Sequence, residues 1–149
     1  MKQLQPAFRL MVVGLLLTAL WWPATGMATE NPTDETRVAG METDWGIEIT
    51  GLRLTANGRM IDFRYRVLDP EKSIPLFERQ TKPYLIDQTS GKVLEVPVTA
   101  KVGPLRNSNL PQAGRIYWMF FGNTGRWVKA GDKVTVTIGD FRAENLIVE

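Results

Sequence analysis

The sequence predicts an all-β protein, an antiparallel sandwich of about seven strands that follows an N-terminal signal peptide. Short apolar–polar alternations recur along the chain, and turn residues separate them. No segment after residue 28 keeps a 3.6-residue apolar period long enough for an amphipathic helix. We therefore divide the chain into a signal peptide (1–28), a flexible polar leader (29–44) and a β-sandwich domain (45–149).

The first 28 residues have the layout of a secretory signal peptide. Lys2 and Arg9 form a positive start, and the apolar run Leu10–Trp22 follows. Gly26 and Ala28 then fit the small-x-small pattern of a cleavage site. The apolar run has 13 residues, whereas a helix needs about 20 to span a bilayer. We therefore expect a periplasmic or secreted protein of the bacterial envelope.

The alternative is an uncleaved segment that tethers the protein to the inner membrane, with Trp21 and Trp22 at the membrane interface. Membrane contact is expected only in that case. Residues 1–28 hold two of the 18 basic residues and none of the 16 acids, so the remainder is electrically neutral. A neutral domain gives no electrostatic reason to expect nucleic acid as a partner.

The complete absence of Cys and His excludes several classes of chemistry. A Ser-His-Asp or Cys-His nucleophile, a zinc site of Cys and His, and a disulfide all need those residues. Met41, Met60 and Met119 are too widely spaced to suggest a copper site. We expect no cofactor, no metal and no enzymatic activity.

The first hairpin is the clearest local prediction. Ile47 to Leu54 alternates but changes phase at Gly51, which is where a β-bulge belongs. Asn57–Gly58 then predicts a two-residue turn with positive φ. The following run places Ile61, Phe63, Tyr65 and Val67 on one face and Asp62, Arg64 and Arg66 on the other.

The rest of the domain predicts further strands between loops. Residues 71–83 are irregular, 84–87 and 93–96 form a second hairpin, and 98–102 form a short edge strand. A long loop over 104–114 precedes the apolar strand 116–121, and an alternating Val/Thr strand covers 134–138. Asp69, Asp87, Asp132 and Asp140 are expected to be turn acids that cap backbone N–H groups, rather than the carboxylate pair of a hydrolase.

A resemblance enters at Lys129–Val136, where a Gly131–Asp132 turn leads into an alternating Val/Thr strand. This arrangement resembles the late-strand entry of immunoglobulin-like exported domains. Residues 45–149 as a whole resemble small exported bacterial immunoglobulin-like β-sandwich proteins of uncharacterised function. The resemblance implies an immunoglobulin-like sandwich and carries no catalytic residues.

The strand 116–121 is apolar on both faces and supplies the candidate site. We expect Ile116, Trp118 and Phe120 to point into the core, and Tyr117, Met119 and Phe121 to lie on the other face. Loops or the 71–83 segment cover that face, or it is exposed as a partner surface. The basic residues that bracket this strand are either solubilising surface charges or sites for an anionic ligand or a lipid headgroup: Arg106, Arg115, Arg126 and Lys129. The candidate binding residues are Tyr117, Met119, Phe121, Trp127, Arg115 and Arg126.

The functional hypothesis is therefore a non-enzymatic binding or accessory module for another envelope protein, or one that self-associates. The first alternative is a small-ligand or glycan-binding module, in which Trp127, Trp45 or Tyr117 stacks beside Arg115 or Arg126. The second alternative is a carboxylate-dependent hydrolase. A flat apolar patch favours a protein partner, whereas an exposed aromatic flanked by polar side chains favours a glycan.

Overall fold

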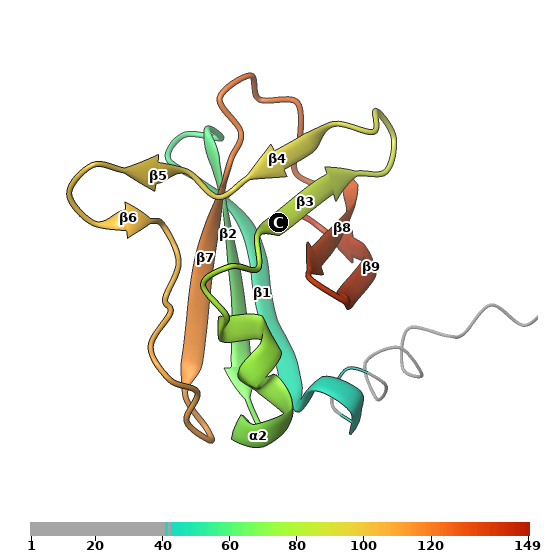
Figure 1. The fold of residues 1–149 in the computed structure, drawn as a ribbon. Coiled ribbons are helices and arrows are strands. Elements are labelled where there is room, and N and C mark those ends of the chain that lie inside the picture. Colours follow the sequence, from blue (N-terminus) through green and yellow to red (C-terminus); the bar gives the residue numbers. More distant parts are fainter. Residues whose placement is uncertain (1–40, 42) are drawn as a thin grey trace, which may run out of the picture. The chain divides into compact units, whose positions relative to one another are not determined.

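The computed structural model describes residues 41 and 43–149, which are mostly β-structure. Seven strands form two antiparallel sheets (Figure 1). Sheet A has the order β1-β2-β7, with β1 (Ile47–Thr55), β2 (Met60–Val67) and β7 (Ile116–Gly122). Sheet B has the order β4-β3-β8-β9, with β3 (Pro83–Asp87), β4 (Val93–Glu95), β8 (Lys133–Ile138) and β9 (Phe141–Ile147). The all-β, antiparallel prediction is confirmed.

Three short elements complete the described part of the chain: α2 (Pro70–Ser73), the 3₁₀ turn η1 (Ile74–Phe77), and a hairpin of β5 (Val98–Thr99) and β6 (Gly103–Pro104). Asp69 caps α2 by accepting from the backbone N–H groups of Glu71 and Lys72. This helix lies where an irregular segment was predicted. Four residues are too few to show a helical period in the sequence.

The first hairpin follows its prediction closely. Strands β1 and β2 pair from Ile47 with Val67 to Thr55 with Met60, and their register shifts between Ile49 and Gly51. The bulge predicted at Gly51 is thus confirmed. Asn57 and Gly58 take φ of 55° and 75° at the centre of the turn. The pairing ends at Thr55 and Met60, so the loop has four residues rather than two.

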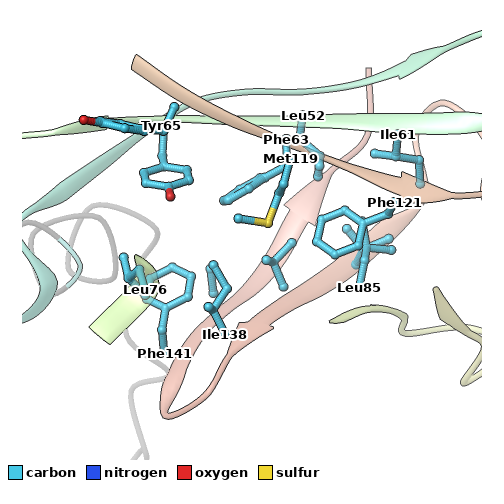
Figure 2. Packing of buried hydrophobic residues seen from close by; sticks show 14 of the residues in the cluster. Leu52, Ile61, Phe63, Tyr65, Leu76, Leu85, Met119, Phe121, Ile138 and Phe141 are labelled. Carbon is cyan, nitrogen blue, oxygen red and sulfur yellow. The ribbon is translucent and has the colours of Figure 1, made fainter. Parts of the chain in front are cut away.

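One hydrophobic core joins the two sheets (Figure 2). Strand β2 contributes the inward row Ile61, Phe63, Tyr65 and Val67, all at most 1% exposed. Sheet B contributes the inward row of β8, whose members Val134, Val136 and Ile138 are equally buried. Because both rows alternate with polar residues, period-two burial accounts for the layered packing.

The faces of β7 are the reverse of the prediction. Tyr117, Met119 and Phe121 are at most 1% exposed and belong to the core, whereas Ile116 is 44% exposed. The register with β2 explains this, because Met119 lies opposite Phe63 and residues directly opposite share a face. The trio predicted to face outward therefore packs between the sheets.

The predicted signal peptide (1–28) lies outside the described residues, as does most of the predicted leader (29–44). Met41 and Trp45 pack against the core. The indole of Trp45 meets the ring of Phe141 edge-on, with the ring centroids 5.6 Å apart. In the part of the chain that the structure describes, no helix is long and apolar enough to cross a membrane.

Candidate functional site

The outward face of sheet A carries apolar side chains beside arginines. On β7, Ile116, Trp118 and Phe120 point away from the core, and the rings of Trp118 and Phe120 lie 5.2 Å apart. Directly opposite them on β2 lie Arg66, Arg64 and Asp62, in the same order. We call these six residues the sheet A face: Ile116, Trp118, Phe120, Arg66, Arg64 and Asp62.

Ion pairs hold the arginines of the sheet A face in place. The Nε of Arg64 lies 2.8 Å from Oδ2 of Asp62, and Nη1 of Arg66 lies 2.8 Å from Oε2 of Glu48. Arg53 lies opposite Asp62 on β1, and its guanidinium folds back over Gly51. Together with the neighbouring Arg53 and Glu48 of β1, the sheet A face presents three arginines against two acids, and both acids are paired.

Asp62 is the buried polar residue of this face, at 4% exposure. Its Oδ2 accepts from Arg64, whereas its Oδ1 has no hydrogen-bond partner among the described residues. This ion pair joins two residues of the same strand, β2. Arg64 is the ion-pair partner of this buried carboxylate and compensates its charge.

The six residues predicted for binding do not form one site. Three of them, Tyr117, Met119 and Phe121, lie in the core. The hydroxyl of Tyr117 donates to the carbonyl of Leu110 (2.8 Å) and accepts from the N–H of Gln112 (3.0 Å), which fastens the loop before β7. Their burial contradicts the outward face on which the binding prediction rested.

The other three predicted residues lie beyond opposite ends of β7. Arg115 precedes the strand and places its guanidinium carbon 5.5 Å from the ring centre of Tyr117. Arg126 and Trp127 follow the strand. The Trp127 ring lies against Gly125, where a Cβ would come within 2.4 Å of it, and the Lys92 ammonium is 5.0 Å from its centre. Trp127 remains 48% exposed beside Lys92.

The acids expected to act in turns do so in three cases. Asp69 caps α2, Asp132 accepts from the N–H of Lys129 (2.8 Å), and Asp87 accepts from the N–H groups of Thr89 and Ser90. The Ser90 hydroxyl and these backbone donors hold the pKa of Asp87 below its usual range. Among the described residues, no group of three acidic side chains gathers to hold a metal ion.

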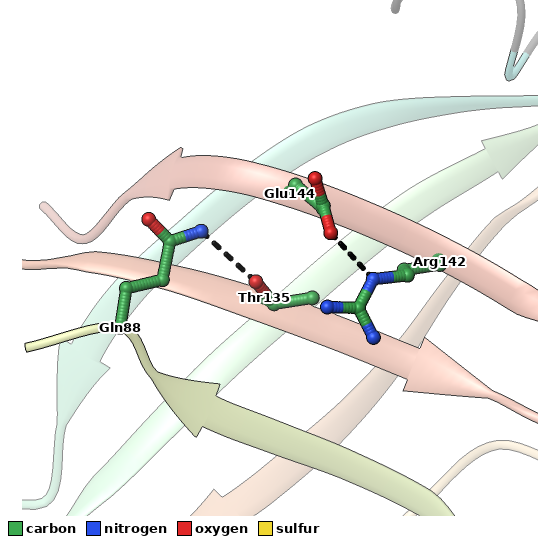
Figure 3. Close-up of polar contacts among 4 residues, drawn as sticks. All are labelled: Gln88, Thr135, Arg142 and Glu144. Carbon is green, nitrogen blue, oxygen red and sulfur yellow. Dashed lines mark hydrogen bonds and ion pairs between the residues drawn. The ribbon is translucent and has the colours of Figure 1, made fainter. Parts of the chain in front are cut away.

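The outward face of sheet B differs in character (Figure 3). Gln88 donates from Nε2 to the hydroxyl of Thr135 (2.9 Å), and Arg142 pairs with Glu144 along β9. The first contact joins the end of β3 to β8, and the second lies within β9. The sheet A face carries the aromatic pair Trp118–Phe120, while sheet B has the exposed apolar residues Val93 and Ile147.

Sequence reasoning chose the strand 116–121 as the candidate site and assigned its two faces the wrong way round. The run on β2 did place Arg64 and Arg66 together on one outward face. The missing information was which residues of β7 stand opposite them. Comparison with protein-family models, curated proteins and solved structures found no match for this chain.

Proposed function

We propose that this chain is a non-enzymatic binding module of the bacterial envelope that recognises another protein through the sheet A face. The observation that carries the proposal is the pairing of Trp118 with Arg64 and of Ile116 with Arg66 across β2 and β7. Interfaces are enriched in aromatic residues and Arg, and Trp and Arg are frequent among the residues that dominate binding energy. The basic residues of this face are all Arg, which suits a protein interface better than a merely solubilising surface.

We also propose that the sandwich is immunoglobulin-like. If the seven strands of the two sheets are named A to G in chain order, the sheets read A-B-E and D-C-F-G. The constant-type immunoglobulin sandwich has A-B-E-D and C-F-G. The difference is the sheet that receives the fourth strand, β4 (Val93–Glu95), which has only three residues.

A glycan is the second candidate ligand for the same face. An aromatic pair flanked by the Arg64–Asp62 ion pair offers both stacking and hydrogen bonding. Against it, the two ring planes are inclined at 43°, so they do not form one flat platform for a sugar. A hydrolase ranks below both, because Asp69, Asp87 and Asp132 accept hydrogen bonds from turn and cap backbone groups.

Export rests on the sequence of residues 1–28, and intact-mass measurement of the protein from its native host tests it. Loss of about 28 residues from the N-terminus supports export with cleavage. A mass that retains the apolar run Leu10–Trp22 contradicts cleavage and favours the tethered form.

The binding proposal is tested with the double variant Trp118→Ser/Arg64→Ser. Its matched control is Val93→Ser/Arg142→Ser, which removes an exposed apolar side chain and an arginine from the opposite sheet. Proteins captured from a cell-envelope extract are quantified for the wild type and both variants. We expect the first variant alone to lose a specific partner. Because Arg64→Ser also removes the ion-pair partner of the buried Asp62, capture is compared at a temperature at which circular dichroism shows all three proteins folded.

Two results contradict the proposal. Equal capture by the wild type and Trp118→Ser/Arg64→Ser shows that the sheet A face does not bind the partner. Equal loss in the Val93→Ser/Arg142→Ser control shows that the effect is not specific to that face. An oligosaccharide array with the same three proteins separates the glycan candidate, which predicts sugar binding that depends on Trp118.

A further inference from the structure

A basic groove lies away from the sheet A face, between the start of β3 and the β5–β6 hairpin. It consists of three adjoining hollows of about 180, 280 and 400 Å³. The 180 and 400 Å³ hollows share Thr81, Lys82 and Tyr84. The 180 and 280 Å³ hollows share Arg79, Pro104 and Arg106. Hollows that share walls in this way provide room for a small ligand.

The groove holds more positive than negative charge. Arg79, Lys82 and Arg106 line it, against the single acid Glu95. Within residues 43–149, none of the three cations lies within 4.0 Å of a carboxylate, since the ion pairs of that region involve Arg64, Arg66 and Arg142. The cations of the groove are therefore available to an anion from outside the chain.

Arg106 is fixed in position before any ligand arrives. Its backbone bridges to Met119 of β7, and its guanidinium donates to the carbonyls of Thr81 (3.0 Å) and Glu78 (2.7 Å). These two bonds use only part of the five N–H donors of a guanidinium. Burial lowers the pKa of Arg106, which indicates a desolvated charge that a bound anion would stabilise.

The wall facing these cations is apolar. Val96, Val98 and Pro104 line the same hollow as Arg106. Val98 is 74% exposed although its side chain is apolar, and Val102, which lines the adjoining hollow, is 73% exposed. A ligand that covered this wall would remove apolar surface from water, which stabilises binding.

We propose that this groove binds a small amphipathic anion, with a carboxylate or phosphate head held by Arg106, Arg79 and Lys82. The apolar body of the ligand lies against Val96, Val98 and Pro104. Guanidinium groups suit such a head because their planar donors match carboxylate and phosphate oxygens. This binding is independent of the protein partner proposed for the sheet A face.

The test measures binding of octyl phosphate to the purified protein by titration calorimetry, with 1-octanol and inorganic phosphate as the two halves of the ligand. The variants are Arg79→Gln and Lys82→Gln, whose side chains are exposed and make no hydrogen bond within residues 43–149. Arg142→Gln, on the outward face of sheet B, is the matched loss of one positive charge.

We expect octyl phosphate to bind more tightly than either 1-octanol or inorganic phosphate. Each groove variant should weaken it about threefold, the effect of a partly exposed charge pair, and Arg79→Gln/Lys82→Gln about tenfold. Arg142→Gln should leave the affinity unchanged. No binding by the wild type, equal affinity for 1-octanol, or equal weakening by Arg142→Gln would each overturn the proposal.

Vesicles of phosphatidylglycerol and of phosphatidylcholine then distinguish a free anion from a lipid headgroup. Binding of octyl phosphate without vesicle binding identifies a free anion as the ligand. Binding of both octyl phosphate and phosphatidylglycerol vesicles, weakened by Lys82→Gln, identifies a lipid headgroup. Vesicle binding without octyl phosphate binding overturns the proposal, because surface charge alone then explains the attraction.

Discussion

Phe120 and Phe121 are adjacent residues of the same type on opposite faces of β7, so they form a matched pair for testing the orientation of this strand. Phe121 is fully buried opposite Ile61, whereas Phe120 lies outward and half-buried opposite Asp62. A Phe side chain buries about 150–250 Å², which at about 25 cal/mol per Å² corresponds to about 4–6 kcal/mol. Measured Phe→Ala substitutions in cores cost about 3–5 kcal/mol.

We therefore expect Phe121→Ala to lower the free energy of unfolding by about 3–5 kcal/mol, and Phe120→Ala by no more than about 1.5 kcal/mol. Urea unfolding followed by circular dichroism measures both. Phe121→Leu, expected to cost about 1–1.5 kcal/mol, keeps the comparison possible if Phe121→Ala does not fold. Equal losses at the two positions, or a larger loss at Phe120, would refute the orientation of β7 and with it the sheet A face.

Three further perturbations probe single features. Gly58→Val should lower the free energy of unfolding by about 1–2 kcal/mol because φ is 75°, whereas Gly58→Asn should lower it less. No atom lies close to a Cβ at this position, so steric crowding does not contribute. Equal melting temperatures of the Val and Asn variants would therefore contradict a conformational cause. Asn123→Ala should cost about 2–4 kcal/mol, since buried Asn123 bonds the carbonyls of Gly58 and Val128 and the N–H of Val128; denaturant midpoints measure it. Asp87, whose pKa is lowered chiefly by the Ser90 hydroxyl, contributes stability above its unfolded pKa that disappears as pH falls through the folded value. In Asp87→Asn, the free energy of unfolding should depend less on pH below about pH 4. The same pH dependence as in the wild type would contradict this role of Asp87.

The sequence predicted those strands in which the alternation of apolar and polar residues is compatible with only one orientation of the strand. On β2, Ile61 to Val67 alternates with Asp62, Arg64 and Arg66, and burial follows that alternation apart from Asp62. The phase change at Gly51 marked the bulge for the same reason. In each case a polar residue on one face excludes the opposite orientation, because burying an unpaired charge costs too much free energy.

Strand β7 has no such residue, and its orientation was therefore undetermined by its own sequence. All six residues from Ile116 to Phe121 are apolar enough for a core, so both orientations satisfy the hydrophobic pattern. The choice comes from β2, whose inward Phe63 and Tyr65 stand opposite Met119 and Tyr117. A register between segments about 50 residues apart is a tertiary property, which local periodicity does not contain.

The basic groove escaped prediction for a related reason. The charges that meet there come from residues 79–82 and from Arg106, which lie on separate loops. The sequence grouped Arg106 with Arg115, Arg126 and Lys129, because they flank one strand. The structure instead joins Arg106 to the carbonyls of Thr81 and Glu78, across a separation of 25 to 28 residues.

The edges of the sheets bear on how a partner binds. Residues 105–107 cover the free edge of β7, since Asn107 donates to the carbonyl of Trp118 and Phe120 donates to that of Leu105. On the far side of sheet A, Glu149 exchanges backbone hydrogen bonds with Leu52 and Leu54 of β1.

Sheet B protects its β9 edge differently. The register of β8 with β9 is irregular between Val134 and Val136, and the charged pair Arg142–Glu144 lies on β9. Bulges and charges are the means by which edge strands avoid pairing with other chains.

A partner that added a strand to β7, or beside Leu52 and Leu54 on β1, would first have to displace existing backbone hydrogen bonds. Recognition by side chains on the sheet A face requires no such exchange, which is why we assign binding to the face of the sheet rather than to an edge.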